Sequence, residues 1–266
     1  LSIYYKEKPE YFRECMESIY SQTVLPDEIV LVEDGRLTDE LYEAISEYEC
    51  RASEINFVTV KLEKNSGLGL ALAEGIKHCS NELVARMDTD DICVPDRFER
   101  QLKVFSNNNN LDVVGGFIAE FDIDKEHIVA ERKVPLCHND IVRYQRKRDG
   151  LNHVSVMFKR KSVLDAGNYK NCLLMEDSLL WANMIKNHCH MANIDEVLVY
   201  VRTGDDMLKR RGGFDYFIKY RSGRRKILQT GTISMSDYFI TVAAQFVVCM
   251  MPLWMRSLVF KKILRN

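Results

Sequence analysis

The sequence predicts an α/β fold in which a mostly parallel, Rossmann-like sheet is flanked by helices. Two observations carry this prediction. Short apolar runs, typical of buried strands, alternate with segments in which apolar residues recur every three to four positions. Strands that alternate with helices build a parallel sheet with helices on both faces. The length of 266 residues is near the upper limit for one hydrophobic core, so we expect one large domain with a short appendage.

The first 115 residues contain the clearest elements. Apolar runs predict strands at residues 1–5, 29–32, 55–62, 83–87 and 111–114. Helical periodicity predicts helices at residues 12–20, 41–48, 69–79 and 98–105. Thr38 is the expected N-cap of the second helix, and a run of asparagines ends the fourth. Ligands of such sheets bind at the carboxyl ends of the strands, so the residues that follow each strand are the first candidates for a site.

The second part of the chain is less regular. Weak strand signals between residues 117 and 149 lead into a charged helix that ends at residues 146–150. Strands are expected at 154–158 and 197–201, and a helix at 176–187. After about residue 203 the composition shifts: cations gather between Lys219 and Lys226, and the mostly apolar stretch 238–251 ends at Pro252. A C-terminal helical extension is therefore expected.

Charge and cysteine content restrict the class of function. The 37 Lys and Arg residues are balanced by 39 Asp and Glu residues, so no basic field drives unspecific nucleic-acid binding and no nucleic-acid partner is expected. The 8 cysteines are dispersed without a CxxC pair, which is typical of reduced thiols in a cytosolic protein. The chain opens without a signal-peptide pattern, and no run of about 18 apolar residues predicts a membrane span. We expect a cytoplasmic location.

An acidic cluster follows the strand predicted at residues 83–87. Asp88 and Asp90 point the same way in extended backbone, because side chains alternate with a period of two, and Asp91 follows directly. Converging carboxylates repel one another unless a cation lies between them, and all-oxygen ligation favours Mg²⁺ or Mn²⁺. The cluster therefore indicates a metal site that holds substrate phosphates. A solvated acidic turn is the alternative.

Three weaker features lie at other element boundaries. Glu33 and Asp34 close the strand at 29–32, where an acid can accept a hydrogen bond from a nucleobase or ribose; an ordinary Asp-Gly turn is the alternative. Gly67 and Gly69 lie between a strand and a helix and permit close approach of a phosphate or base, although no dinucleotide or P-loop fingerprint is present. Glu176 and Asp177 open the helix at 176–187, where an acid serves as a general base or simply complements the helix dipole.

The segment His188, Cys189 and His190 is similar to a metal-binding cluster in composition only. Partners at zinc-site spacing are missing from the sequence. We therefore expect these three to be ordinary surface or core residues.

Taken together, these residues resemble the inverting nucleotide-sugar glycosyltransferases of family 2, of the bacterial polysaccharide or O-antigen type, which have the GT-A fold. Four features agree in order and spacing over residues 1–204: the helix end at 17–23, the segment 32–35, the acidic motif at 87–91, and Glu176 and Asp177 followed by Trp181. The resemblance implies a GT-A domain at 1–204, with a nucleotide-binding half at about 1–115 and an acceptor half at about 116–204. Residues 205–266 then form the C-terminal helical, membrane-associating extension.

The resemblance also implies roles for individual residues. Asp177 matches the catalytic base, and Asp90 and Asp91 match the metal side of the acidic motif, with the choice between them open. The positions that match the nucleotide pocket are Ser2 and Tyr4 at the end of the first strand, Asp34 as the acid that reads uracil, Gly67 beside the base, and Asp88 near the ribose and diphosphate, with Asp90. Leu72 and Ala73 stand where many members have Arg and Asn. Lys209, Arg210 and Arg211 are candidates to clamp the diphosphate.

The implied activity is that of a metal-dependent hexosyltransferase with Mg²⁺ or Mn²⁺ as cofactor. It would move a sugar from a nucleotide-sugar donor, a UDP-sugar by the resemblance, to a glycan or lipid-linked saccharide acceptor in surface polysaccharide synthesis. The metal would neutralise charge on the leaving diphosphate while Asp177 deprotonates the acceptor hydroxyl. A nucleotidyltransferase and a catalytically silent sugar-nucleotide-binding scaffold are the alternatives.

The C-terminal segment suggests where such an acceptor is met. The cations at 221–226 and the apolar segments on either side of Pro252 are typical of an element that lies on an anionic membrane surface, with Trp254 and Phe260 as anchors. We expect peripheral contact with the cytoplasmic face of the cell membrane. The alternative is that these helices close the core or form an oligomer interface.

Overall fold

The computed structural model describes residues 1–51, 55–203 and 211–259. At its N-terminal end, three strands form a parallel sheet in the order β1 (Ser2–Ile3), β2 (Glu28–Glu33) and β3 (Asn56–Lys61). Helices α1 (Pro9–Tyr20) and α2 (Asp39–Glu49) share one hydrophobic core with Ile29 and Leu31 of β2. Helix α3 (Leu68–His78) packs on the other face, where Gly75 lies against Val32. Alternate residues of β2 therefore face opposite helices.

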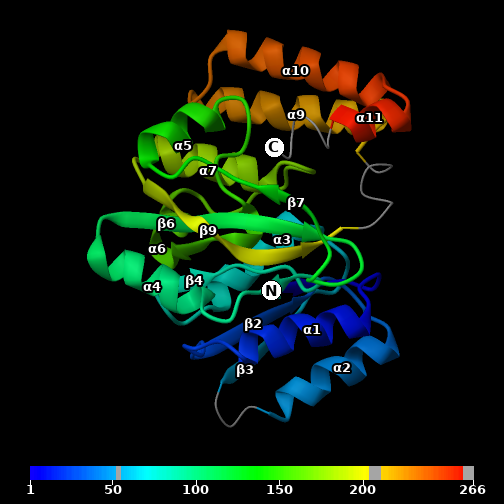
Figure 1. Cartoon of the computed structure of the whole chain (residues 1–266), viewed down its shortest axis with the longest axis vertical. Helices are drawn as coiled ribbons and strands as arrows, with labels where there is room; N and C mark the ends of the chain where they lie inside the picture. Colours follow the sequence, from blue (N-terminus) through cyan, green and yellow to red (C-terminus); the bar gives the residue numbers. More distant parts are fainter. Residues whose placement is uncertain (52–54, 204–210, 260–266) are drawn as a thin grey trace.

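A second, six-stranded sheet crosses the middle of the molecule (Figure 1). Its main path runs β4 (Leu83–Ala85), β8 (Met157–Lys159), β6 (Leu111–Phe121), β9 (His190–Arg202) and β5 (Ile92–Cys93), and β7 (Ile128–Arg132) pairs with β6. Only β6 and β9 pair in parallel; the other pairs in this sheet are antiparallel. The parallel pairing that the sequence predicts therefore describes the first sheet, whereas short returning strands such as β7 and β8 make the second sheet mixed.

Helices cover both ends of this arrangement. Around the second sheet lie α4 (Arg97–Asn107), α5 (His138–Gln145), α6 (Arg160–Asp165) and α7 (Glu176–Lys186). The C-terminal part of the described chain forms α9 (Phe214–Thr230), α10 (Met235–Met250) and α11 (Leu253–Val259). Figure 1 shows α9 and α10 stacked at the end of the molecule opposite α1 and α2, with α9 nearer to α5 and α7.

Specific contacts join α9 and α10 to the rest of the chain. The guanidinium of Arg146, after α5, donates two hydrogen bonds of 2.9 and 2.7 Å to the buried carboxylate of Asp237 in α10. Arg224 of α9 donates to the Arg146 carbonyl at 2.7 Å. A Cβ at Gly223 would lie 2.8 Å from the Met175 sulfur, so only a glycine lets α9 approach the residue that precedes α7 this closely.

The structure differs from the predicted elements at several places. Residues His153–Ser155 form a 3₁₀ turn, so the strand expected at 154–158 is only β8, which begins at Met157. The Ser155 hydroxyl lies 2.9 Å from the Asn152 carbonyl and 3.1 Å from the Gly116 carbonyl, which favours a turn over a strand here. Strands β6 and β9 run longer than expected, and the short elements β5 and α6 were not anticipated.

No helix in residues 1–51, 55–203 and 211–259 combines the length and apolar character needed to cross a bilayer.

Candidate active site

The ends of β1, β2 and β4 converge at one edge of the molecule. Ser2 pairs with Val32 across the first sheet, and the Asp34 N–H donates to the Ile3 carbonyl at 2.8 Å. The hydroxyl of Thr89, inside the acidic motif, donates to the Glu7 carboxylate at 2.9 Å and lies 3.4 Å from the Ser2 carbonyl. Segments separated by more than eighty positions are thus brought together. Tyr4 extends from this edge with a side chain that is 37% exposed.

Asp34 and Gly67 form one local unit. Both carboxylate oxygens of the buried Asp34 accept backbone hydrogen bonds, from Ser66 at 2.6 Å and from Gly67 at 3.0 Å. Gly67 has a φ of 87°, a conformation that favours glycine, and it precedes the first residue of α3. Asp34 therefore shapes the turn that leads into α3, and each of its oxygens keeps a second lone pair for a ligand.

The acidic motif gathers three carboxylates. Ligand atoms of Asp88, Asp90 and Asp91 lie within 4.8 Å of one another, and the described residues contain no other group of three or more His, Cys, Asp or Glu side chains gathered this closely. Both Asp88 oxygens accept hydrogen bonds from the buried guanidinium of Arg86, one of them at 2.9 Å. Asp91 is 2% exposed and accepts the backbone N–H of Arg202 at 3.0 Å.

Asp90 differs from its two neighbours. Within the described part of the chain, no other residue donates a hydrogen bond to its carboxylate, whereas its carbonyl accepts from Arg202 at 3.3 Å. Burial, together with the charges of Asp88 and Glu7, raises the pKa of Asp90 to about 7. Burial and the charges of Asp90 and Asp88 raise the pKa of Asp91 well above its usual range. Crowded, partly buried oxygen ligands of this kind fit Mg²⁺ or Mn²⁺, which would remove the repulsion.

A second acidic group lies at the start of α7. The Ser178 N–H donates to Asp177 at 2.7 Å, and burial followed by the charges of Asp149 and Glu176 raises the pKa of Asp177 to about 7. Burial also raises the pKa of Glu176. A Cβ at Gly69 would lie 2.9 Å from the Glu176 Cβ, so the start of α3 and the start of α7 are in close contact. A carboxylate with a pKa near neutrality is suited to general-base catalysis.

Arg86 connects the two acidic groups. Its guanidinium pairs with Asp88, and its positive charge also acts on Asp90, Asp91, Glu176 and Asp177. The acidic motif after β4 and the acids of α7 therefore lie within the electrostatic reach of one buried cation.

Sequence reasoning missed four residues of this site. They are Glu7, Arg86, Asp149 and Arg202. Arg86 gave a readable signal, because a charged residue inside the apolar run at 83–87 requires a partner. For Glu7, Asp149 and Arg202 no local pattern in the sequence distinguishes them from other loop or strand-end residues.

Several other sequence expectations concern positions away from this centre. Leu72 of α3 is buried in the core, and the partly buried Ala73 of the same helix packs against that core. Of the three cations named as a diphosphate clamp, Lys209 and Arg210 lie outside the described residues. Phe260, named as a membrane anchor, also lies outside them. Trp254 is 66% exposed.

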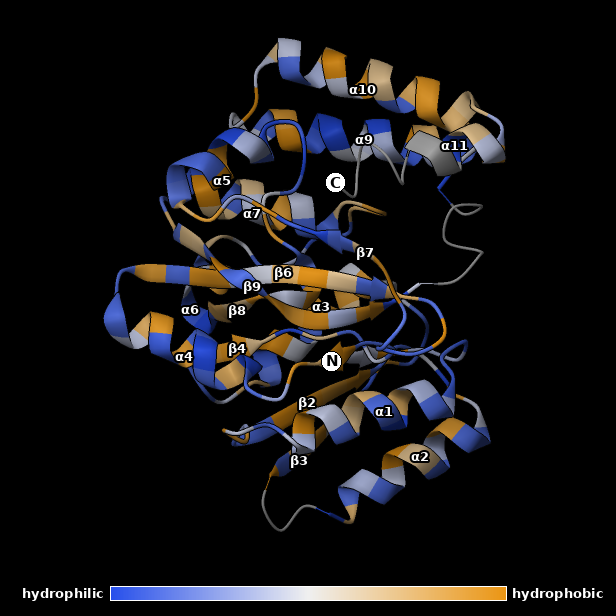
Figure 2. Cartoon of the chain, viewed as in Figure 1, coloured by the Kyte–Doolittle hydropathy of each residue, from blue (hydrophilic) through white to orange (hydrophobic). Residues whose placement is uncertain are grey.

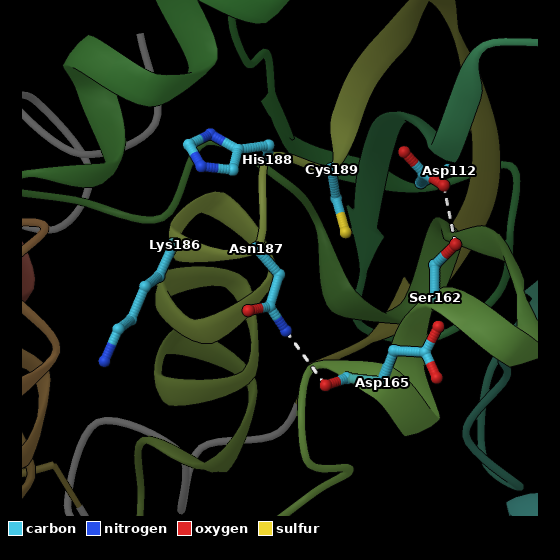
Figure 3. A pocket seen from close by; sticks show the side chains of 7 residues that line it. All are labelled: Asp112, Ser162, Asp165, Lys186, Asn187, His188 and Cys189. Carbon is cyan, nitrogen blue, oxygen red and sulfur yellow. Dashed lines mark hydrogen bonds between the residues drawn. The ribbon is translucent and has the colours of Figure 1, made fainter.

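A polar depression between β6, α6 and α7 contains the segment with His188 and Cys189 (Figure 3). Its polar groups are engaged in joining elements: Asp112 accepts from the Ser162 hydroxyl at 2.6 Å and from the His190 N–H at 2.8 Å. His190 begins β9, whereas Arg202, at the other end of this strand, contacts the acidic motif. The depression is thus distant along β9 from the acidic centre and serves as a structural junction.

The sequence is similar to those of known proteins. The family model described as "Glycosyl transferase family 2" matches residues 2–165. An uncharacterized glycosyltransferase of Haemophilus influenzae is 41% identical over 236 residues, 86% of each chain. The amylovoran biosynthesis glycosyltransferase AmsE of Erwinia amylovora is 38% identical over 90% of each chain. A UDP-Gal:alpha-D-GlcNAc-diphosphoundecaprenol beta-1,3-galactosyltransferase of Escherichia coli is 34% identical over all of this chain and 95% of its own length.

Solved structures are similar in fold. Staphylococcus aureus TarS 1–349 in complex with UDP-GlcNAc has a TM-score of 0.63 at 17% identity, covering 92% of this chain and 71% of that chain. The mannosyltransferase PcManGT from Pyrobaculum calidifontis, in complex with GDP-Man and Mn²⁺, has a TM-score of 0.64 at 14% identity, covering 92% and 68%. At this level of identity the likeness concerns the fold alone.

Proposed function

The chain belongs to glycosyl transferase family 2 and is a glycosyltransferase with a GT-A-like α/β fold. On this premise we propose a specific reaction for it. It transfers a sugar, with inversion, from a UDP-sugar to a lipid-linked saccharide during synthesis of a surface polysaccharide, and it requires Mg²⁺ or Mn²⁺. One observation carries the proposal: the acids after β4 and the acids of α7 share the buried cation Arg86. Leaving-group stabilisation and proton removal, the two requirements of an inverting transfer, are therefore available in one site.

The acidic motif would hold the metal, with Asp90 as the principal ligand. Asp88 is engaged by Arg86 on both oxygens, and Asp91 accepts the Arg202 N–H, whereas Asp90 has no donor from another described residue. Bound here, the cation supplies charge neutralisation for the departing nucleoside diphosphate. The nucleoside lies along the convergent strand ends, where Ser2, Tyr4, Asp34 and Gly67 form its pocket, and Asp88 lies toward the ribose and diphosphate.

Asp177 removes the proton from the acceptor hydroxyl. Its position at the start of α7, next to Asp149 and Glu176, keeps the carboxylate basic near neutral pH. The oxygen so activated attacks the anomeric carbon on the face opposite the leaving diphosphate, so the configuration is inverted and no covalent sugar–enzyme intermediate is required.

The relatives guide the choice of substrates. The relative from Escherichia coli that covers the whole chain is named for transfer of galactose from UDP-Gal to GlcNAc-diphosphoundecaprenol, and a second relative is named for amylovoran biosynthesis. These names support UDP-galactose and a GlcNAc-diphospholipid as the first donor and acceptor to test. They also support a place in surface polysaccharide synthesis.

The domain division follows from this assignment. Residues 1–204 form the catalytic domain, with the nucleotide half at about 1–115 and the acceptor half at about 116–204, and residues 205–266 form the extension. In the extension, α10 carries one charged residue, Asp237, and this residue is buried. The outward face of α10 and α11 is apolar; it consists of Met235, Phe239, Ile240, Phe246, Val247, Met250, Leu253, Trp254 and Met255.

This outward face binds the cytoplasmic surface of the cell membrane. Figure 2 shows hydrophobic bands along α10, whereas the middle of the adjacent α9 is hydrophilic. Four exposed cations lie on α9, namely Lys219, Arg221, Arg225 and Lys226, against one exposed acid, Asp215. An apolar face beside basic side chains matches an anionic lipid surface. A lipid-linked acceptor would be met there.

One experiment tests the reaction. The full chain is incubated with UDP-galactose, a GlcNAc-diphospholipid and Mn²⁺, and the lipid products are analysed by mass spectrometry and NMR. Transfer of a hexose with a β-linkage supports the proposal. Release of pyrophosphate would instead indicate a nucleotidyltransferase, and binding of UDP-sugars without turnover across a panel of donors and acceptors would indicate a silent scaffold.

A further inference from the structure

Asp149 is the carboxylate with the largest charge effect on Asp177, and it is held from three elements. Its Oδ1 accepts hydrogen bonds from Gln145 of α5 at 2.7 Å and from the Ser178 hydroxyl of α7 at 2.6 Å. Its carbonyl accepts from Arg132 of β7 at 2.8 Å. Gln145 also accepts the Gly150 N–H at 2.8 Å, so its buried amide closes the turn that carries Asp149. Such convergence keeps the carboxylate in one position.

Ser178 bridges Asp149 and Asp177. Its backbone N–H donates to Asp177 at 2.7 Å, while its hydroxyl donates to Asp149 at 2.6 Å. Ser178 itself is buried. Any movement of α7 relative to the Asp149 turn must therefore break a hydrogen bond within a buried environment, which is costly.

The geometry points to Asp149 as a positioning residue for Asp177: through Ser178 it fixes the start of α7, and it places a second carboxylate beside Asp177. This inference rests on the proposed function, in which Asp177 is the general base. Asp149 acts on Asp177 and takes no proton from the acceptor. Neither the sequence reasoning nor the comparisons assign a role to it.

Several other groups also face Asp177, and the effect of the Asp149 charge on the pKa of Asp177 adds to theirs. From its own helix Glu176 raises the pKa of Asp177, and Arg86, after β4, lowers it. Tyr169 and Cys172, in the segment before α7, and Tyr216 of α9 also interact electrostatically with Asp177. Burial makes the largest contribution and Asp149 the next largest, so removal of this one charge has a measurable effect.

Two variants separate position from charge. Asp149→Asn keeps an oxygen that accepts from Ser178 and Gln145 but removes the charge. Ser178→Ala breaks the side-chain link but leaves both carboxylates and the backbone N–H. Asp165→Asn, at an exposed acid that pairs with Lys161 on α6, is the matched control for loss of one negative charge.

The readout is the titration of Asp177 itself. Full-length protein labelled with ¹³C at the aspartate carboxyl carbons is titrated by NMR, and the Asp177 resonance is assigned by its absence in Asp177→Asn. We expect the midpoint to move toward lower pH by about one pH unit in Asp149→Asn and to stay in place in Ser178→Ala and Asp165→Asn. An unchanged midpoint in folded Asp149→Asn overturns the role of its charge.

Kinetics test the link through Ser178. With UDP-galactose and a GlcNAc-diphospholipid, Ser178→Ala is expected to lower kcat about 10- to 100-fold with little change in the affinity for UDP, because the base is misplaced while the donor pocket is intact. A wild-type kcat in Ser178→Ala overturns the positioning role of Asp149. This kinetic experiment decides the question if Asp149→Asn does not fold. If the proposed function is wrong, Asp177→Asn remains active. The NMR titration still tests the effect of Asp149 on the Asp177 midpoint in that case.

Discussion

At the scale of single residues, the site depends on how a few buried charges are compensated. Arg86 pairs with Asp88, and its charge also lowers the pKa of four other carboxylates, those of Asp90, Asp91, Glu176 and Asp177. Burial and neighbouring acids outweigh this effect at Asp90 and Asp177, and they raise the pKa of each to about 7. Perturbed pKa values of this kind are typical of functional sites, because each role requires a particular protonation state.

The first prediction concerns Asp177. Asp177→Asn preserves shape but cannot accept the acceptor's proton, so we expect kcat to fall about 10²- to 10⁴-fold while UDP affinity, measured by calorimetry, stays near the wild-type value. Glu176→Gln, next to it on α7, is the matched control and should retain much more activity. Wild-type turnover by Asp177→Asn together with loss of turnover by Glu176→Gln would transfer the role of base to Glu176.

The second prediction concerns the metal. Asp90→Asn should weaken Mn²⁺ binding more than 10-fold in electron paramagnetic resonance titrations, whereas Asp91→Asn, which keeps an oxygen for the Arg202 N–H, should weaken it less. Asp122→Asn, at an exposed acid of the loop after β6, should bind Mn²⁺ like the wild type. Full turnover in excess chelator, or in the double variant Asp90→Ala/Asp91→Ala, would contradict metal dependence.

The third prediction is a pH dependence with a definite sign. A general base must be deprotonated, and the raised pKa of Asp177, about 7, means that it is mostly protonated below neutral pH. We therefore expect kcat at saturating Mn²⁺ to rise about tenfold per pH unit below pH 7 and to level off above it. A flat profile from pH 5 to pH 8, in steady-state assays with constant ionic strength, would exclude Asp177 as the group that limits the rate.

At the scale of elements, the packing of α10 depends on its N-terminus. Ser234 and Asp237 form a capping box, and the Asp237 carboxylate also accepts from Arg146. The Ser234 hydroxyl is the main cause that lowers the pKa of Asp237 to about 2, and Arg146 contributes. The hydrogen bonds of the Asp237 carboxylate are therefore present at neutral pH. A carboxyl group whose pKa is lower in the folded than in the unfolded chain stabilises the fold above its unfolded pKa, so this stabilisation is lost only as the pH falls toward 2.

The fourth prediction belongs to this helix. Asp237→Ala should lower the free energy of unfolding by about 1–2 kcal/mol in urea denaturation, because it removes the reciprocal cap and the partner of Arg146. Asp215→Ala, at an exposed acid in the first turn of α9, is the control and should change stability far less. Equal stability of the two variants would show that the capping box contributes little to the packing of the extension.

At the scale of the whole molecule, the site and the apolar face of α10 and α11 are linked through α9. Helix α9 packs on α7 next to Met175, and α10 packs on α9, so the surface proposed to bind lipid is two helices away from Asp177. Figure 1 shows this stack at one end of the long axis. A lipid-linked acceptor held at the membrane would approach the site from this end.

The fifth prediction tests that surface. The full chain should sediment with anionic liposomes at low salt, and the double variant Phe239→Ser/Trp254→Ser should lose most of this binding because both side chains are exposed apolar anchors. Val129→Ser, at an exposed apolar residue of β7, is the control and should bind as the wild type does. If the double variant binds liposomes normally, or if it changes only the oligomeric state measured by light scattering, the face is not a membrane surface.

Sequence patterns by themselves determined the elements and the acids that follow them. Period-two and period-3.6 repeats depend on neighbours within one or two turns, so β2, β3, α1 and α2 could be read locally, and the Thr38 side chain does accept the Leu41 N–H. The acidic motif after β4 could be read for the same reason, since it directly follows a strand. The carboxylates that the structure gathers, those of Asp88, Asp90 and Asp91, lie within four consecutive positions.

Only the tertiary structure decided which of these groups meet. The pairing of Arg202 with the acidic motif and the bridge from Asp149 to Asp177 through Ser178 join segments far apart in the chain. The antiparallel pairs of the second sheet and the outward, uncharged face of α10 likewise depend on how elements pack. No local repeat encodes such contacts, because they arise from the burial of whole elements against one another, and burial is also what raises the pKa values on which the proposed chemistry depends.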